Sequence, residues 1–166
     1  VRAIADLAHA NGALLYVDII QGVGAVPVDV KAMGIDLAAC STFKWLMGSK
    51  GFGFMYVRKD LQDTRVLPTQ HHGGLNFNYG PWTDSPDSAL GEFDFKPTTG
   101  PAMYEVSYPS YEGVSSAITS MKYIHTLGVE NIRNHVRTLT SRLAIELPKI
   151  GYPMITPEGN ESPIIV

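Results

Sequence analysis

Three short apolar runs in the first third of the chain restrict its fold more than any other feature. They are "ALLYVD" (residues 13–18), "IDLAAC" (35–40) and "FGFMYV" (52–57), and turn-forming residues lie between them. Runs of this length are typical of buried strands, because a helix usually needs about ten residues or more. A helix-like segment precedes the first run, and "VKAMG" (30–34) can form one helical turn before the second. Continuous apolar strands that alternate with helical segments predict an α/β sheet covered on both faces.

Three longer segments have the periodicity of helices. The first is residues 1–12, where Gly12 can take the left-handed position at the end of a helix. The second runs from about residue 110 to 127 and ends at Gly128, and the third from about 129 to 147. Their apolar positions at helical spacing are Ile4, Leu7 and Ala8; Val114, Ala117, Ile118, Met121 and Ile124; and Ile132, Val136, Leu139, Leu143 and Leu147. We interpret the third as a packed helix with a solvated basic face.

Residues 62–109 have a different character. They are rich in Gly, Pro, Asp, Ser and aromatic residues and show little periodicity. A structureless loop of this length is unusual inside a compact domain, so we predict a functional loop or a surface that another segment or subunit covers. The chain begins without Met and ends in an apolar run, and we expect it to be an internal piece of a longer protein.

Composition excludes several classes of partner. The formal charge of -3 and the absence of a basic run argue against nucleic acid, because phosphate binding needs clustered Lys and Arg. No apolar run approaches the roughly 20 residues of a membrane span. The single cysteine, Cys40, excludes an internal disulfide framework and indicates a reducing compartment, so we expect a cytoplasmic location.

Polar side chains follow two of the predicted strands. Asp18 closes the first run and Gln21 lies three residues on; Ser41 follows the second run and Lys44 lies three residues on. Ligands in open α/β sheets bind outside the carboxyl ends of the strands. We therefore expect an acid, an amide, a hydroxyl and a lysine to converge at one edge of the sheet.

This set of groups suits the chemistry of pyridoxal phosphate. A lysine amine can form a Schiff base with an aldehyde, although its pKa of about 10.4 must be lowered for it to react near neutral pH. The apolar neighbours that could supply desolvation are Phe43, Trp45 and Leu46. An Asp that holds a pyridine nitrogen protonated is the other part of the protein's contribution. Gln21 could donate to the phenolic oxygen of the cofactor, and Ser41 could bind its phosphate.

The chain resembles the cofactor-binding core of class V aminotransferase-fold enzymes over "YVDIIQGVGAVPVDVKAMGIDLAACSTFKWLMGSKGFGFMYVRKDL" (16–61). These are fold-type I enzymes that use pyridoxal 5'-phosphate, and their pattern is Asp-x-x-Gln, then Ser-x-His-Lys, then a glycine-rich hairpin. The resemblance covers most of residues 1–60 and continues more weakly through residues 104–133. Within the family, "KWLMGSKGFGFMYVRKDL" (44–61) is most similar to the isopenicillin N epimerase-like branch.

The resemblance implies a fold and a domain plan. Residues 1–109 would belong to the pyridoxal phosphate-binding large domain, in its C-terminal half, with a mostly parallel sheet and flanking helices. Residues 110–150 would be connecting helices, and residues 151–166 would begin a truncated small α+β domain. Enzymes of this type are usually dimers with active sites at the subunit interface, so a homodimer is also implied.

The resemblance also implies an enzyme that acts on an amino acid through a lysine Schiff base. Lys44 would carry the cofactor and shuttle the substrate's α-proton, Asp18 would pair with the pyridine nitrogen, Gln21 would contact the ring oxygen, and Ser41 would bind the phosphate. The reaction expected is that of a class V aminotransferase or an isopenicillin N epimerase-like enzyme. A cysteine desulfurase and a side-chain lyase of the same family remain alternatives.

The sequence departs from the family pattern at two places. Phe43 stands where histidine is common, and Ser107 and Tyr108 stand where Gly-Thr often reaches the neighbouring subunit's phosphate. The ring-stacking residue and the carboxylate-binding arginine would lie outside residues 1–166, so we expect this segment alone to be inactive. A non-catalytic fragment or interaction module is therefore the alternative of another class.

Other reactive residues have simpler interpretations. Cys40 lies inside an apolar run, which predicts a core thiol rather than a desulfurase nucleophile. His71 and His72, with Asp84 and Asp87, fit no zinc spacing, so no metal is expected. We expect the glycine- and aromatic-rich loop to line the mouth of an active site instead, and its candidate substrate contacts are Asn76, Tyr79 and Trp82.

Overall fold

The computed structural model describes residues 1–64, 66–67, 99–105 and 108–166, and positions 65, 68–98 and 106–107 lie outside the described residues. The chain forms two compact units, one of residues 1–56 with 110–166 and the other of residues 57–109. The domain boundaries expected from the sequence stay a prediction. Within the described residues, none of the helices combines the length and hydropathy that a bilayer crossing requires.

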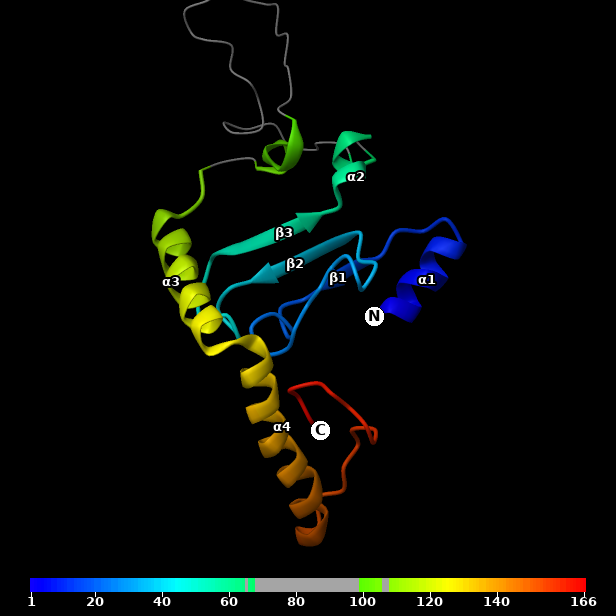
Figure 1. Cartoon of the computed structure of the whole chain (residues 1–166), viewed down its shortest axis with the longest axis vertical. Helices are drawn as coiled ribbons and strands as arrows, with labels where there is room; N and C mark the ends of the chain where they lie inside the picture. The colour runs from blue at the N-terminus through cyan, green and yellow to red at the C-terminus, as the bar shows by residue number, and fades with distance from the viewer. Residues whose placement is uncertain (65, 68–98, 106–107) are drawn as a thin grey trace, which may run out of the picture. The chain divides into compact units, whose positions relative to one another are not determined.

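A three-stranded sheet belongs to the first unit, apart from Val57, the last residue of its third strand. Its strands are β1 (Tyr16–Asp18), β2 (Leu37–Ser41) and β3 (Gly53–Val57), in the order β1-β2-β3. β1 and β2 are parallel, with Tyr16 opposite Leu37 and Asp18 opposite Ala39. β3 returns in the opposite direction, as the arrows in Figure 1 show, so the sheet is mixed. The three predicted strands are confirmed.

Only the central strand is buried as predicted. β2 contributes Leu37, Ala38 and Cys40 to the core, whereas β1 and β3 are largely exposed. The prediction that all three runs are buried is therefore wrong for β1 and β3. Within the described residues each of these has a neighbouring strand on one side only. The buried core cluster consists of Ile19, Ile35, Ala38, Cys40, Leu46 and Ile124.

Two helices follow one another in the second half of the chain, α3 (Tyr111–Leu127) and α4 (Val129–Glu146). The Ser110 side chain caps α3 by accepting a hydrogen bond from the Gly113 backbone N–H at 3.2 Å. Gly128, at φ 80°, ends α3, as predicted. A Cβ on Gly113 would come within 2.8 Å of the Phe52 Cβ, which shows how closely α3 packs on the chain before β3.

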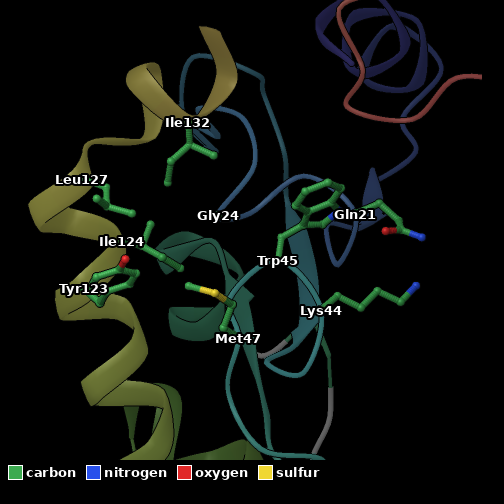
Figure 2. Close-up of a pocket in the computed structure, with 9 residues that line it drawn as sticks. All are labelled: Gln21, Gly24, Lys44, Trp45, Met47, Tyr123, Ile124, Leu127 and Ile132. Carbon is green, nitrogen blue, oxygen red and sulfur yellow. The ribbon is translucent and has the colours of Figure 1, made fainter. Parts of the chain in front are cut away.

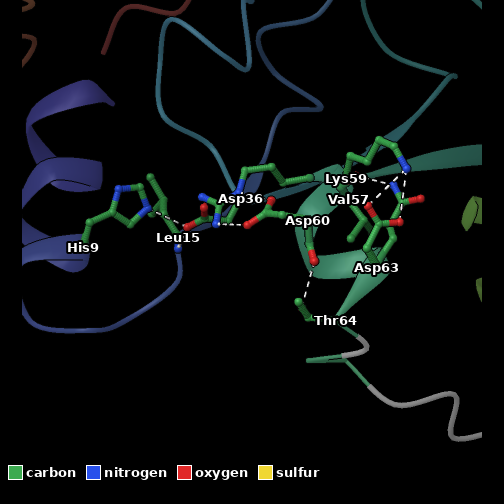
Figure 3. Close-up of polar contacts among 10 residues, drawn as sticks. His9, Leu15, Asp36, Val57, Lys59, Asp60, Asp63 and Thr64 are labelled. Carbon is green, nitrogen blue, oxygen red and sulfur yellow. Dashed lines mark hydrogen bonds and ion pairs between the residues drawn. The ribbon is translucent and has the colours of Figure 1, made fainter.

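Helix α1 (Arg2–Ala10) is held beside the sheet by a buried carboxylate. Asp36 is fully buried, and its Oδ2 lies 2.7 Å from His9 Nε2 and accepts the Leu15 backbone N–H at 2.7 Å (Figure 3). Such partners are needed because an unpaired carboxylate is costly to bury. The buried residue of α1 is Ala5, and the predicted apolar face with Ile4 and Leu7 is exposed in the described residues.

The remaining elements are short. In the second unit, α2 (Lys59–Asp63) and η1 (Gly100–Tyr104) are in contact and bury Leu61 and Met103. An exposed ion pair joins Lys59 to Asp63 at 3.1 Å (Figure 3), and pairs of this kind contribute little to stability. In the first unit, η2 (Pro148–Ile150) follows α4, and the Ile155 backbone N–H donates to the Val166 carbonyl at 2.7 Å.

Candidate functional site

The carboxyl ends of β1 and β2 meet at one edge of the sheet. Asp18 is the last residue of β1 and Ser41 the last of β2. The parallel pairing extends one step beyond β1, because the Ile19 N–H donates to the Ala39 carbonyl at 2.9 Å. The structure thus brings together the two strand ends from which the predicted site residues follow.

Asp18 lies at this edge of the sheet, and its side chain also makes a hydrogen bond to the backbone of the following turn. Its side chain is exposed, and Oδ1 accepts the Ile20 backbone N–H at 3.0 Å. This contact is an Asx turn, the role that an aspartate often has at a strand end. A carboxylate has two oxygens and about four acceptor positions, so the turn leaves acceptor capacity for a ligand.

The turn after β1 packs against the loop that carries Lys44. Gly24 in this turn has φ +91°, and a Cβ there would lie 2.8 Å from the Trp45 carbonyl oxygen. Only glycine fits at such an approach. Gln21 is exposed in the same turn, and it lines a cavity of about 610 Å³ together with Lys44. The two predicted site residues that follow the strands therefore share one cavity.

The Lys44 loop, residues 42–52, joins β2 to β3 and is closed by backbone hydrogen bonds. The Thr42 N–H donates to the Phe52 carbonyl at 3.0 Å, and the Gly48 N–H donates to the Thr42 carbonyl at 2.7 Å. Inside the loop, the Met47 N–H donates to the Lys44 carbonyl at 2.9 Å. Lys44 is thus the first residue of a tight turn at the tip of a closed loop.

In Figure 2, the residues that line the cavity lie on two sides of Trp45. The Gln21 and Lys44 side chains extend on one side of it, and Tyr123 and Leu127 of α3 lie on the other. The cavity therefore offers polar groups next to an apolar wall. Its lining residues are Gln21, Gly24, Lys44, Trp45, Met47, Tyr123, Ile124, Leu127 and Ile132.

The predicted desolvation of Lys44 by its apolar neighbours is contradicted for the described residues. Lys44 is exposed, and Leu46 belongs to the core cluster. Phe43 is itself exposed, and Trp45 is half-buried. Phe43 thus faces outward and Leu46 packs into the core, whereas Trp45 lines the same cavity as Lys44 without burying it.

Cys40 is a core thiol, as predicted. Its side chain is 3% exposed, and its Sγ donates to the Ser41 carbonyl at 3.3 Å. Burial raises the pKa of the Cys40 thiol, and the negative charge of Asp18 raises it further. A thiol of this kind is a poor nucleophile near neutral pH, since the thiolate is the reactive form. Ser41 beside it is half-buried at the end of the strand.

Several predicted contacts are not placed at this site. Asn76, Tyr79, Trp82 and Ser107 lie outside the described residues, as do His71, His72, Asp84 and Asp87. Tyr108 is described and exposed, and it belongs to the second unit. Across residues 1–64, 66–67, 99–105 and 108–166, no group of three or more His, Cys, Asp or Glu side chains is arranged to hold a metal ion.

Sequence reasoning missed two residues that shape the site. Thr42 is fully buried, and its Oγ1 lies 3.1 Å from the Ser49 carbonyl oxygen. Ser116 of α3 accepts the Ser49 N–H at 2.9 Å. Neither contact has a signal in the sequence, because the hydroxyls of Ser and Thr are common at the surface and Ser116 is 67 residues from Ser49.

Comparison with known proteins identifies the family of this chain. The family model "Aminotransferase class-V" matches residues 1–165. The chain belongs to the class V aminotransferase family. The uncharacterized aminotransferase YcbU of Bacillus subtilis (strain 168) is 29% identical over 166 residues, which is 100% of this chain and 41% of that protein. A probable cysteine desulfurase of Methanothermobacter thermautotrophicus is 32% identical over 143 residues, or 86% of this chain and 33% of that protein.

A solved structure supports the fold. The apo structure of a cysteine desulfurase from Thermococcus onnurineus NA1 matches with a TM-score of 0.82 at 25% identity, over 99% of this chain and 39% of that one. The predicted fold class, an α/β part of a fold-type I large domain, is confirmed. The chain spans less than half of the length of each of these three proteins.

Proposed function

We propose that this class V family member binds pyridoxal 5'-phosphate at the edge formed by β1 and β2 and uses Lys44 to act on an amino acid. One observation carries the proposal. Asp18 and Ser41 end adjacent parallel strands, and the two turns that follow pack together at Gly24 and Trp45. The proposal therefore rests on a spatial convergence and not on the sequence motif alone.

The groups present suit this cofactor. Asp18 has free acceptor capacity for a protonated pyridine nitrogen, Gln21 offers an amide donor for a phenolic oxygen, and Ser41 offers a hydroxyl for a phosphate oxygen. When bound, pyridoxal phosphate supplies an aldehyde for the lysine amine and a ring that takes up the electron pair from the substrate's Cα–H bond. Lys44 Nζ, on its closed loop, would hold the cofactor and would accept the substrate's α-proton.

We infer that the reaction is that of an aminotransferase or an isopenicillin N epimerase-like enzyme. The matching relative YcbU is named an aminotransferase and aligns with the whole chain. The stretch 44–61 is the part that favours the epimerase-like branch. Substrate profiling separates these two, because transamination consumes a 2-oxo acid and epimerisation only inverts the α-carbon.

Cysteine desulfuration is the second candidate, because several of the matching proteins, among them the two described above, are named as cysteine desulfurases. Cys40 does not favour it, since that thiol is buried and its pKa is raised. A sulfide-release assay with cysteine, with alanine production measured in parallel, decides between this candidate and the first. A side-chain lyase that works by β-elimination would instead release the side-chain leaving group together with an ammonium ion and a 2-oxo acid.

We infer further that the protein works as a homodimer. Exposed apolar side chains lie close to the site on the loop and on α3, namely Phe43, Met47 and Tyr123, and a second copy could cover them. Light scattering on the full-length protein tests this inference. A cytoplasmic location, and roles for Ser107, Tyr108, Asn76, Tyr79 and Trp82 at the substrate or the neighbouring subunit, also stay predictions.

The deciding test is spectroscopic. Full-length protein is mixed with pyridoxal phosphate, its visible absorption is recorded before and after borohydride, and the modified peptide is mapped. We expect a visible band that disappears on reduction and a stable adduct on Lys44. The Lys50→Ala variant is the matched control, because Lys50 is an exposed lysine on the same loop. Absence of the band, or an adduct on another lysine, would favour a non-catalytic protein.

A further inference from the structure

The Thr42 side chain closes the Lys44 loop from inside. It is among the largest fully buried side chains, and its Oγ1 lies 3.1 Å from the Ser49 carbonyl oxygen and 3.2 Å from that of Phe52. A hydroxyl has one proton to donate. The Phe52 carbonyl already receives the Thr42 backbone N–H at 3.0 Å. The bond to Ser49 is therefore the contact that only the hydroxyl can supply.

Ser49 is held from the opposite side by helix α3. Its backbone N–H donates to Ser116 Oγ at 2.9 Å, across 67 residues of sequence. The peptide groups on both sides of Ser49 Cα are thus fixed, one by the strand end and one by the helix. There is no room for a side chain at Gly48, because a Cβ there would lie 2.7 Å from both Cβ and Oγ1 of Thr42.

These contacts fix the part of the loop in which Lys44 lies. Lys44 follows Thr42 by two residues, and its carbonyl accepts the Met47 N–H at 2.9 Å. Met47 has φ 55°, a left-handed conformation that a residue with a long side chain holds only when its surroundings enforce it. The Lys44 side chain is exposed, so its own packing does not set its position.

We propose that Thr42 and Ser116 are positioning residues for Lys44. The Thr42 hydroxyl and the Ser116 hydroxyl hold Ser49 between β2 and α3, and the closed loop presents the lysine amine at one place in the cavity. The role of Lys44 itself rests on the proposed function. Both hydroxyls bond to backbone groups of the loop, so in this proposal they act through Lys44.

The first experiment measures the loop without cofactor. Amide hydrogen exchange is followed in the cofactor-free full-length protein and in Thr42→Val, Thr42→Ser, Ser116→Ala and Ser115→Ala. Valine keeps the shape of threonine without the hydroxyl, and Ser115 is the exposed neighbour of Ser116. We expect loop amides 48–49 to exchange about tenfold faster in Thr42→Val and in Ser116→Ala, the effect of losing one net hydrogen bond. Thr42→Ser and Ser115→Ala should match the parent protein.

The second experiment measures Lys44 directly. The five proteins are loaded with pyridoxal phosphate, and the borohydride-stable adduct on Lys44 is quantified after a fixed short incubation. We expect a loss of about tenfold or more in Thr42→Val and Ser116→Ala, because small displacements of a reacting group lower its rate steeply. The Thr42→Ser variant should restore the adduct, since it restores the hydroxyl and not the methyl group.

The two experiments together distinguish positioning by the hydroxyls from packing by the Thr42 methyl group. Faster exchange with unchanged adduct formation would overturn the positioning role, because the loop would then be loosened without effect on Lys44. Failure of Thr42→Ser to restore both signals would also overturn it, since packing of the methyl group would then be the cause. If Thr42→Val does not fold, Ser116→Ala decides. If the parent protein forms no adduct on Lys44, the proposed function is wrong, and so is the positioning role. The exchange data still show whether the two hydroxyls hold the loop.

Discussion

The Lys44 loop and helix α4 differ in how the rest of the chain covers them. The loop is irregular, yet Thr42 is 0% exposed and Leu46 is 4% exposed. Helix α4 is regular over 18 residues, yet none of them is buried, and its predicted apolar stripe is open at Leu139 and Leu143. Regular secondary structure and burial are thus separate properties in this chain.

Backbone hydrogen bonding explains the difference. A helix satisfies its N–H and C=O groups internally, so α4 can form without tertiary partners for its backbone. A loop has no such regular pattern. The Lys44 loop bonds its own ends together at Thr42 and Phe52, uses the Thr42 hydroxyl, and gains one partner from α3, Ser116. The candidate site therefore has an exposed lysine on a loop that is fixed from within, an arrangement that suits precise placement of a functional group.

The largest expected effect comes from removing Lys44, the lysine proposed to form the Schiff base. Lys44→Ala should lower turnover by about 10³-fold or more and abolish the visible cofactor band, because no other group replaces the amine. The free energy of unfolding should change by less than about 0.5 kcal/mol, since Lys44 is exposed. Steady-state kinetics and chemical denaturation measure the two quantities. Equal activity in Lys44→Ala and in the Lys50→Ala control would show that Lys44 has no role in catalysis.

A pair of leucine variants tests the difference in burial itself. Leu46→Ala should lower the free energy of unfolding by about 3 kcal/mol, because it leaves a cavity in the core cluster. Leu143→Ala should cost less than about 1 kcal/mol, since Leu143 is 45% exposed. Denaturant titration of the full-length protein gives both values. A cost above about 2 kcal/mol for Leu143→Ala would mean that another part of the assembly covers α4, and the contrast with the loop would then disappear.

Sequence predicted those features of this fold that depend on neighbours along the chain. The start of α3 at Ser110 and its end at Gly128 follow from capping residues, and the three strands follow from short apolar runs. The place of Asp18 and Ser41 at one edge follows from parallel strands that end together. Local chemistry and a general rule of topology were sufficient for these features.

Sequence failed where contacts join distant segments. The exposure of β1 and β3 depends on which strands flank them, and an apolar run carries no such information. The pairing of His9 with the buried Asp36 spans 27 residues, and that of Ser49 with Ser116 spans 67. The exposure of Lys44 depends on the direction of a tight turn, which its apolar neighbours in the sequence do not reveal.

Two glycines offer a smaller test of how closely the loop is packed. Gly24→Ala should lower the free energy of unfolding by about 2–3 kcal/mol, because the residue has φ +91° and its Cβ would meet the Trp45 carbonyl oxygen. Gly12→Ala is the matched control: its φ is +70°, but nothing lies within 4 Å of the new Cβ, so only the backbone strain of about 1 kcal/mol remains. Thermal unfolding followed by circular dichroism compares the two. Equal losses would show that the turn after β1 does not press on the Lys44 loop.

The smallest expected effect concerns the protonation of Cys40, in the strand that leads into the loop. Burial and the Asp18 charge raise the pKa of this thiol above its ordinary value of 9.0. The stability that the protonated thiol contributes is therefore complete below about pH 9 and is lost as the pH rises toward the folded-state pKa.

Alkylation of Cys40 by iodoacetamide at about pH 8 should be much slower in the native protein than in denaturant. Asp18→Asn should speed alkylation only slightly, because burial is the larger cause. Rapid alkylation of the native protein would mean that β2 opens to solvent. The end of β2 could then not hold the Lys44 loop in a fixed position.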